Sequence, residues 1–271
     1  MDESPSAKLF RLTRFEYPES EGVTAVPTHG RIGGSTFFPG GDGLYREDEP
    51  EPPFPFGKIM VIGNDFDTLE NFEEAPRDGE IQAGTWVNLR HLLTEARVDP
   101  ADAFYTNCYL GLRLDAKTNR GPAPGSRNEA YRGNCLRVMA EQIGYVKPRV
   151  ILCLKQPAKR LIADLACKLA REQRTAVEPG TSAATPPDVM AGSDSLDDWR
   201  RDLTFKEIDS GNPVRRNVQF GGLQVDAIVA LTHPCLPNAD RCRGSFGNEK
   251  GAKAEVEMVR EATRGLYGAR P

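Results

Sequence analysis

Short apolar runs alternate with amphipathic segments along this chain, and this alternation limits the fold more than any other feature. The first run is KIMVIG, and the four runs cover residues 58–63, 103–107, 149–154 and 223–232. Apolar residues recur every three or four positions at residues 84–96, 128–144, 157–170 and 248–264. Buried strands that alternate with amphipathic helices are typical of a parallel sheet covered on both faces. We therefore predict an α/β fold, with three α/β/α layers around a central, mainly parallel four-stranded sheet.

Other stretches depart from this pattern. Residues 1–57 are rich in Gly, Pro and acidic residues, and we predict an irregular N-terminal extension with polyproline II character at residues 50–55. Residues 172–198 are rich in Ser, Thr, Pro and Gly, which predicts a surface insertion in the domain formed by residues 58–271. Residues 217–219 are predicted to form a hairpin with the run at 223–232, across Gly221 and Gly222.

The charges of the chain are unevenly distributed. The chain holds 35 basic and 39 acidic residues, a formal net charge of −4, which taken alone argues against nucleic-acid binding. Residues 113–160, however, contain eleven basic residues and three acidic ones. A positive segment in an otherwise acidic protein favours contacts with phosphate groups.

Composition also excludes several classes of protein. The six cysteines form no CxxC motif, so we expect reduced thiols, no metal site and no cofactor. No run approaches the roughly 20 apolar residues of a membrane span, and no signal-peptide pattern is visible, so we expect a monomeric cytoplasmic protein without a membrane partner. The motifs GxSxG, GxxxxGK[ST] and GxGxxG do not occur, which leaves an unrelated hydrolase without support.

Polar residues follow the predicted strands directly. The sequences at these strand ends are GNDFD at 63–67, TNC at 106–108, LKQ at 154–156 and THPC at 232–235. In open α/β sheets, ligands bind outside the carboxyl ends of the strands. We therefore expect the functional site at this edge of the sheet.

These motifs, in this order, resemble those of the uracil-DNA glycosylase superfamily over roughly residues 58–265. Members carry a Gly-x-Asp-Pro-Tyr type turn after the first strand, an Asn that reads the base, a Pro-x-Val-Ile strand and a His-Pro-Ser motif before a loop that enters the DNA. This chain has GNDFD, Asn107, the segment PRVI at 148–151 and HPC at 233–235. The resemblance implies a monofunctional DNA glycosylase, an enzyme of base excision that flips a nucleotide and hydrolyses its N-glycosidic bond with water.

The resemblance also implies roles for three strand-end residues. Asp65 falls where the superfamily places the acid that orients water and stabilises the cationic sugar, and His233 matches the histidine that donates a hydrogen bond to the leaving base. Asn107 matches the side chain that hydrogen-bonds the edge of the extruded base. On residue type alone, each of the three could instead be structural, with the Asp and Asn in loop caps or turns.

Further residues fall into two groups on the same resemblance. Asn64, Phe66, Asp67 and Phe72 are candidates for binding the base, the two Phe rings by stacking, although either ring could equally belong to the core. The candidates for DNA contacts are Leu236 as an apolar wedge, together with Arg241, Arg243, Arg120 and Arg127.

The chain departs from the superfamily pattern at three positions. Phe66 replaces the usual Pro, Cys235 replaces the Ser after His-Pro, and Asp67 replaces the Tyr that shields the pocket from substituents at pyrimidine C5. A polar residue at position 67 favours a C5-modified cytosine, hydroxymethylated or glycosylated, and a role in defence against viral DNA. The alternative is a non-catalytic nucleic-acid-binding module with the same fold. Iron–sulfur members carry an N-terminal cysteine pair that is missing here, so no cluster is predicted.

Overall fold

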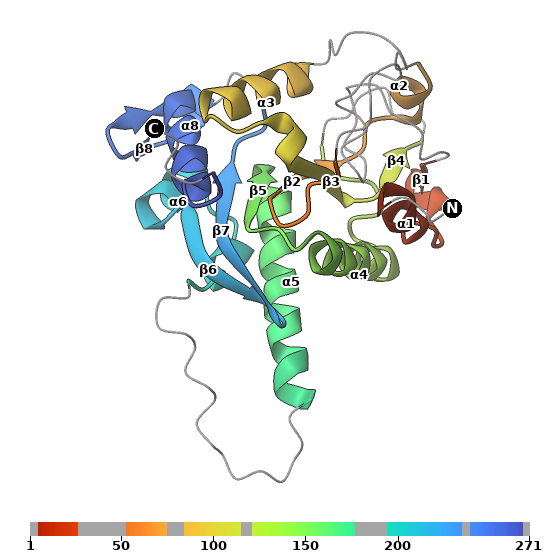
Figure 1. The fold of residues 1–271 in the computed structure, drawn as a ribbon. Coiled ribbons are helices and arrows are strands. Elements are labelled where there is room, and N and C mark those ends of the chain that lie inside the picture. The colour runs from red at the N-terminus through yellow and green to blue at the C-terminus, as the bar shows by residue number, and fades with distance from the viewer. Residues whose placement is uncertain are drawn as a thin grey trace.

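A central sheet of five strands organises the protein (Figure 1). The structure is a computed structural model, and it describes residues 5–26, 53–74, 84–114, 121–176, 194–234 and 239–267. The strand order is β3-β2-β5-β7-β6. The strands are β3 (Ala103–Tyr109), β2 (Ile59–Asp65), β5 (Val150–Leu154), β7 (Leu223–Leu231) and β6 (Val214–Phe220).

Four of these strands run parallel, and β6 pairs antiparallel with β7 at one edge. The predicted α/β fold is confirmed, but the prediction of a four-stranded sheet is wrong by one strand. The predicted hairpin exists, and its first arm is a full seven-residue strand that belongs to the same sheet. The strands β2 and β5 are buried along nearly their whole length, as their apolar sequences require.

Helices cover both faces of the sheet, which produces the three predicted layers (Figure 1). On one face α4 (Glu129–Val146) and α5 (Lys155–Ala176) pack against the side chains of alternate strand residues such as Met60. On the other face α3 (Gly84–Glu95) and α8 (Gly251–Thr263) pack against residues such as Val61 and Leu152. Successive strand residues point to opposite faces, so one strand contributes to both cores.

The N-terminal segment is more regular than its composition predicts. It contains α1 (Pro5–Arg11), a 3₁₀ turn η1 (Glu19–Glu21) and β1 (Val23–Ala25), which pairs antiparallel with β4 (Gly111–Arg113). At Gly111 an added Cβ would lie 2.4 Å from Cγ2 of Val23, so this close pairing requires glycine. The prediction of an irregular extension is therefore wrong for residues 5–26, and residues 27–52, with much of the predicted polyproline II segment, lie outside the described residues.

Short elements complete the structure. They are α2 (Leu69–Glu74), η3 (Pro100–Asp102), η4 (Asp197–Arg200), α6 (Phe205–Gly211), α7 (Ala239–Cys242), β8 (Ser245–Phe246) and β9 (Glu249–Lys250). The predicted insertion at 172–198 starts within the last turns of α5, its residues 177–193 lie outside the described part, and its end leads into η4 with a fully buried Trp199. Among the described residues, no helix has both the length and the apolar character to span a membrane.

Candidate active site at the carboxyl ends of the parallel strands

The parallel strands bring the predicted catalytic residues to one edge of the sheet. Asp65 is the last residue of β2 and lies opposite Tyr109 of β3. His233 lies two residues after the end of β7, and β5 separates β7 from β2. Asn107, in β3, is paired by register with Gly63 of β2 and is fully buried. The three residues therefore share an edge, and the side chain of Asn107 lies below its surface.

The carboxylate of Asp65 is held by a buried arginine. Nε and Nη2 of Arg113 lie 2.7 and 2.6 Å from Oδ2 of Asp65, and the amide of Asn64 donates to Oδ1 at 2.9 Å. The two charged side chains are 5% and 9% exposed. Burial is the largest influence and raises the pKa of Asp65 above its usual value, and the positive charges of Arg113 and Lys155 oppose part of this rise. The carboxylate therefore has a fixed orientation, and because it is buried, its charge would interact strongly with nearby groups.

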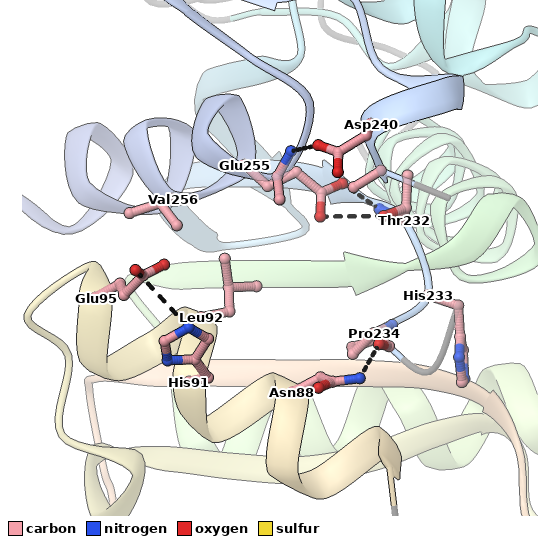
Figure 2. A pocket seen from close by; sticks show the side chains of 12 residues that line it. Asn88, His91, Leu92, Glu95, Thr232, His233, Pro234, Asp240, Glu255 and Val256 are labelled. Carbon is pink, nitrogen blue, oxygen red and sulfur yellow. Dashed lines mark hydrogen bonds and ion pairs between the residues drawn. The ribbon is translucent and has the colours of Figure 1, made fainter. Parts of the chain in front are cut away.

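His233 is neutral near pH 7. Burial, with a smaller contribution from the charge of Lys155, lowers the pKa of its imidazole to about 4. The following residue, Pro234, accepts a hydrogen bond from Nδ2 of Asn88 in α3 at 2.7 Å, as Figure 2 shows. This bond ties the backbone that follows His233 to α3, which limits the positions that the imidazole can take.

A buried network fixes the residue before His233. Oε1 and Oε2 of Glu255, in α8, accept hydrogen bonds from the backbone nitrogen and Oγ1 of Thr232 at 2.6 and 3.0 Å. Arg243 lies 3.4 Å from Glu255 and 3.4 Å from Asp209, and its side chain is 0% exposed. The prediction that Arg243 contacts DNA is therefore wrong, because its guanidinium is buried between two carboxylates and supports the end of β7.

The aromatic candidates belong to the core. Phe66 and Phe72 are 2% and 7% exposed and lie in an apolar cluster with Leu112 and Tyr131. This placement is the alternative that the residue types left open, and neither ring is exposed for stacking on a base. The amide of Asn64, another base-binding candidate, is also buried, and it orients Asp65 instead.

Asp67 helps to form the start of α2. Its Oδ1 accepts hydrogen bonds from the backbone nitrogen of Thr68 at 2.8 Å and from Nδ2 of Asn71 at 2.9 Å. Oγ1 of Thr68 in turn accepts from the backbone nitrogen of Asn71 at 3.1 Å. These are helix-capping interactions, so the prediction that Asp67 offers its carboxylate to a base substituent does not fit the arrangement of Oδ1.

In the structure, acidic side chains partly neutralise the positive charges of the basic segment at residues 113–160. Several of its arginines are paired with acids from other parts of the chain: Arg113 with Asp65, Arg132 with Asp164, Arg149 with Asp226 and Arg160 with Asp202. Arg127 and Arg241 are exposed, as a phosphate contact requires. Arg120, Leu236 and Cys235 lie outside the described residues.

Two charged residues of the site were missed by the sequence reasoning. Arg113 and Lys155 were counted among the basic residues of 113–160, yet both act electrostatically on Asp65. Lys155 follows β5 directly, so its position at a strand end was the signal that could have identified it. For Arg113 the sequence holds no such signal, because its partner is 48 residues away.

A cavity of about 330 Å³ adjoins this edge of the sheet (Figure 2). Its walls come from α3, the segment after β7, α7 and α8, and His233 is one of its lining residues. Asp65 and Asn107 are not among them. In the part of the chain that the structure describes, no three His, Cys, Asp or Glu side chains are grouped so that they could hold a metal ion.

No protein-family model matches the chain, and no curated protein is significantly similar to it in sequence. The geometry and charges of the site are therefore the basis on which a function is inferred.

Proposed function

We propose that the protein is a DNA glycosylase that hydrolyses the N-glycosidic bond of an extruded nucleotide with water. The observation that carries this proposal is that a carboxylate of fixed orientation, Asp65, and a neutral imidazole, His233, follow parallel strands at the same edge of the sheet. In the proposed reaction Asp65 acts as the carboxylate and His233 as the neutral imidazole.

In the proposed reaction the bond between C1′ and the base nitrogen breaks, and its electron pair leaves with the base. The sugar becomes cationic, and the negative charge of Asp65 stabilises it and aligns the attacking water. Water forms the new C1′–O bond, and the proton that it loses passes through solvent to the base anion that has departed. His233, being neutral, can donate an N–H to the base oxygen on which negative charge develops, without first protonating the base.

For the base, we propose a C5-substituted cytosine. Position 67 holds Asp, whereas the uracil-DNA glycosylase superfamily, which the sequence resembles, has the Tyr that closes the pocket. Hydrogen bonds from Thr68 and Asn71 hold the Asp67 carboxylate at the start of α2. No aromatic ring at position 67 therefore fills the space beside C5. Removal of such bases would suit defence against viruses with modified DNA.

The test is incubation with oligonucleotides that each carry one candidate base, followed by alkali and detection of strand breaks at abasic sites. The panel contains uracil, 5-hydroxymethylcytosine, a glycosylated cytosine and unmodified cytosine. We expect breaks at the C5-substituted cytosines and fewer at uracil. Excision of uracil alone would contradict the substrate assignment. Binding of DNA with no excision of any base would contradict the enzyme and favour the non-catalytic binding module.

DNA affinity is expected to fall steeply as salt rises, because exposed arginines such as Arg127 and Arg241 contact phosphates. Charge reversal of either residue to Glu should weaken binding to all sequences alike and reduce the slope of log affinity against log salt by about one. Fluorescence anisotropy at several salt concentrations measures both quantities. Arg149→Glu is the matched control, since Arg149 is at the amino end of β5 and bonds Asp226. An affinity independent of salt would rule out this mode of binding.

A further inference from the structure

Lys155 lies between the two proposed reacting groups in the order of the sheet. It is the first residue after β5, and β5 lies between β2, which ends in Asp65, and β7, which leads to His233. Leu154 is paired by register with Leu231, so the residues that follow them, Lys155 and Thr232, begin at the same edge of the sheet. The topology therefore places one cationic side chain at the centre of the candidate site.

The backbone of Lys155 is in a conformation that favours glycine. Its φ is 72°, in the left-handed region where a Cβ causes steric strain. The start of α5 is secured independently of this side chain, because Gln156 donates to the carbonyl of Leu203 and Lys159 to that of Arg201. A glycine at position 155 would form the same turn without strain, so the turn itself does not explain a lysine there.

The charge of Lys155 acts on both reacting groups. Burial is the largest influence on both groups: it raises the pKa of Asp65 above its usual value and lowers the pKa of His233. The charge of Lys155 adds a smaller contribution that lowers both pKa values, because a nearby cation favours the ionised carboxyl and the neutral imidazole. Arg113, from β4, is the second cation that acts on Asp65. Burial raises the pKa of Cys108 and of Tyr131, and the negative charge of Asp65 adds to the rise of each.

We propose that Lys155 is an electrostatic positioning residue, which keeps Asp65 charged and His233 neutral at the same time. The inference rests on the proposed function, because an ionised carboxylate and a neutral imidazole are the forms that base excision requires. Its consequences for His233 and for the backbone can be measured without any substrate.

The first test is a titration of His233 by NMR in the full-length chain, which contains three histidines. In Lys155→Gly and Lys155→Gln, we expect the pKa of His233 to rise from about 4 by about half a pH unit or more. Lys155→Arg keeps the charge and should restore the wild-type titration. The Gly variant should also unfold at the same temperature as the wild type or a higher one, because it relieves the backbone. An unchanged titration of His233 in both uncharged variants would overturn the proposal.

The second test is the pH profile of excision by the same variants. Loss of the cation should move the acid limb of kcat/KM to higher pH, with activity lowered by up to about tenfold on that limb and recovering at alkaline pH. Lys155→Arg should return the limb to its wild-type position. A loss equal at all pH values would show that Lys155 acts in some other way. If the wild type excises no base at all, the proposed function fails, and the NMR titration alone decides the role of Lys155.

Discussion

Replacing Asp65 with Asn, or His233 with Ala, is expected to lower the rate of base excision by at least about a hundredfold in each case. Asp65→Asn keeps the shape of the side chain but removes the charge that stabilises the cationic sugar in the proposed reaction. His233→Ala removes the N–H that we propose as the donor to the leaving base. Single-turnover rates with a saturating amount of enzyme measure the loss directly, because they exclude product release.

The control for Asp65→Asn is Asp67→Asn, two residues further along the chain. Asp67 has its Oδ1 at the start of α2, and an amide oxygen can accept the same hydrogen bonds, so this variant should excise bases at nearly the wild-type rate. Asp65→Asn also leaves the buried Arg113 without its countercharge, so thermal unfolding of each variant must accompany the rates. Near wild-type rates in folded Asp65→Asn and His233→Ala would remove both residues from the mechanism.

The apolar strands could be predicted from the sequence because both of their faces are buried. The run at 58–63 corresponds to β2 at Ile59–Asp65, and the run at 149–154 corresponds to β5 at Val150–Leu154. Burial on both faces requires apolar residues at consecutive positions, and this pattern is visible without knowledge of the partners. The same reasoning placed Asp65 and His233 at one edge, since the ends of parallel strands coincide.

The edge strand β6 could not be recognised in the same way. Its burial is irregular, and two of its residues are arginines that are paired with distant acids, Arg215 with Asp198 and Arg216 with Glu261. In the sequence, such residues resemble an exposed loop. Unlike β3 at the opposite edge of the sheet, β6 is only partly buried, so its sequence carries little of the pattern that identifies a buried strand.

Buried charged residues could not be identified from the sequence for a related reason. Arg243 was predicted to contact DNA because it lies in the loop that the resemblance assigns to DNA binding. Its actual partners, Asp209 and Glu255, come from α6 and α8. Arg113 was counted among surface charges, although it binds Asp65. Sequence shows the charge of a residue, but the acid that neutralises it becomes visible when the fold brings the two together.

Arg243→Met is expected to lower the free energy of unfolding by about 3–5 kcal/mol, because it leaves Asp209 and Glu255 buried without their cation. Urea denaturation followed by circular dichroism measures this difference. Arg241→Met is the matched control, two positions earlier and exposed, and should change the free energy by less than about 0.5 kcal/mol. A loss of excision without any loss of stability in Arg243→Met would instead support a direct contact with DNA.

The deficit of Arg243→Met should also depend on pH. Burial raises the pKa of Asp209 and of Glu255 above the ordinary carboxyl values, while Arg243 lowers both. Removing Arg243 therefore raises these pKa values further in the folded protein, so the folded variant binds protons more tightly than the unfolded chain does. Stability then increases as pH falls through the raised pKa values, and the deficit relative to wild type should be smaller at pH 5 than at pH 7. Equal deficits at both pH values would mean that lost packing around the Arg243 side chain, and not the unpaired carboxylates, destabilises the variant.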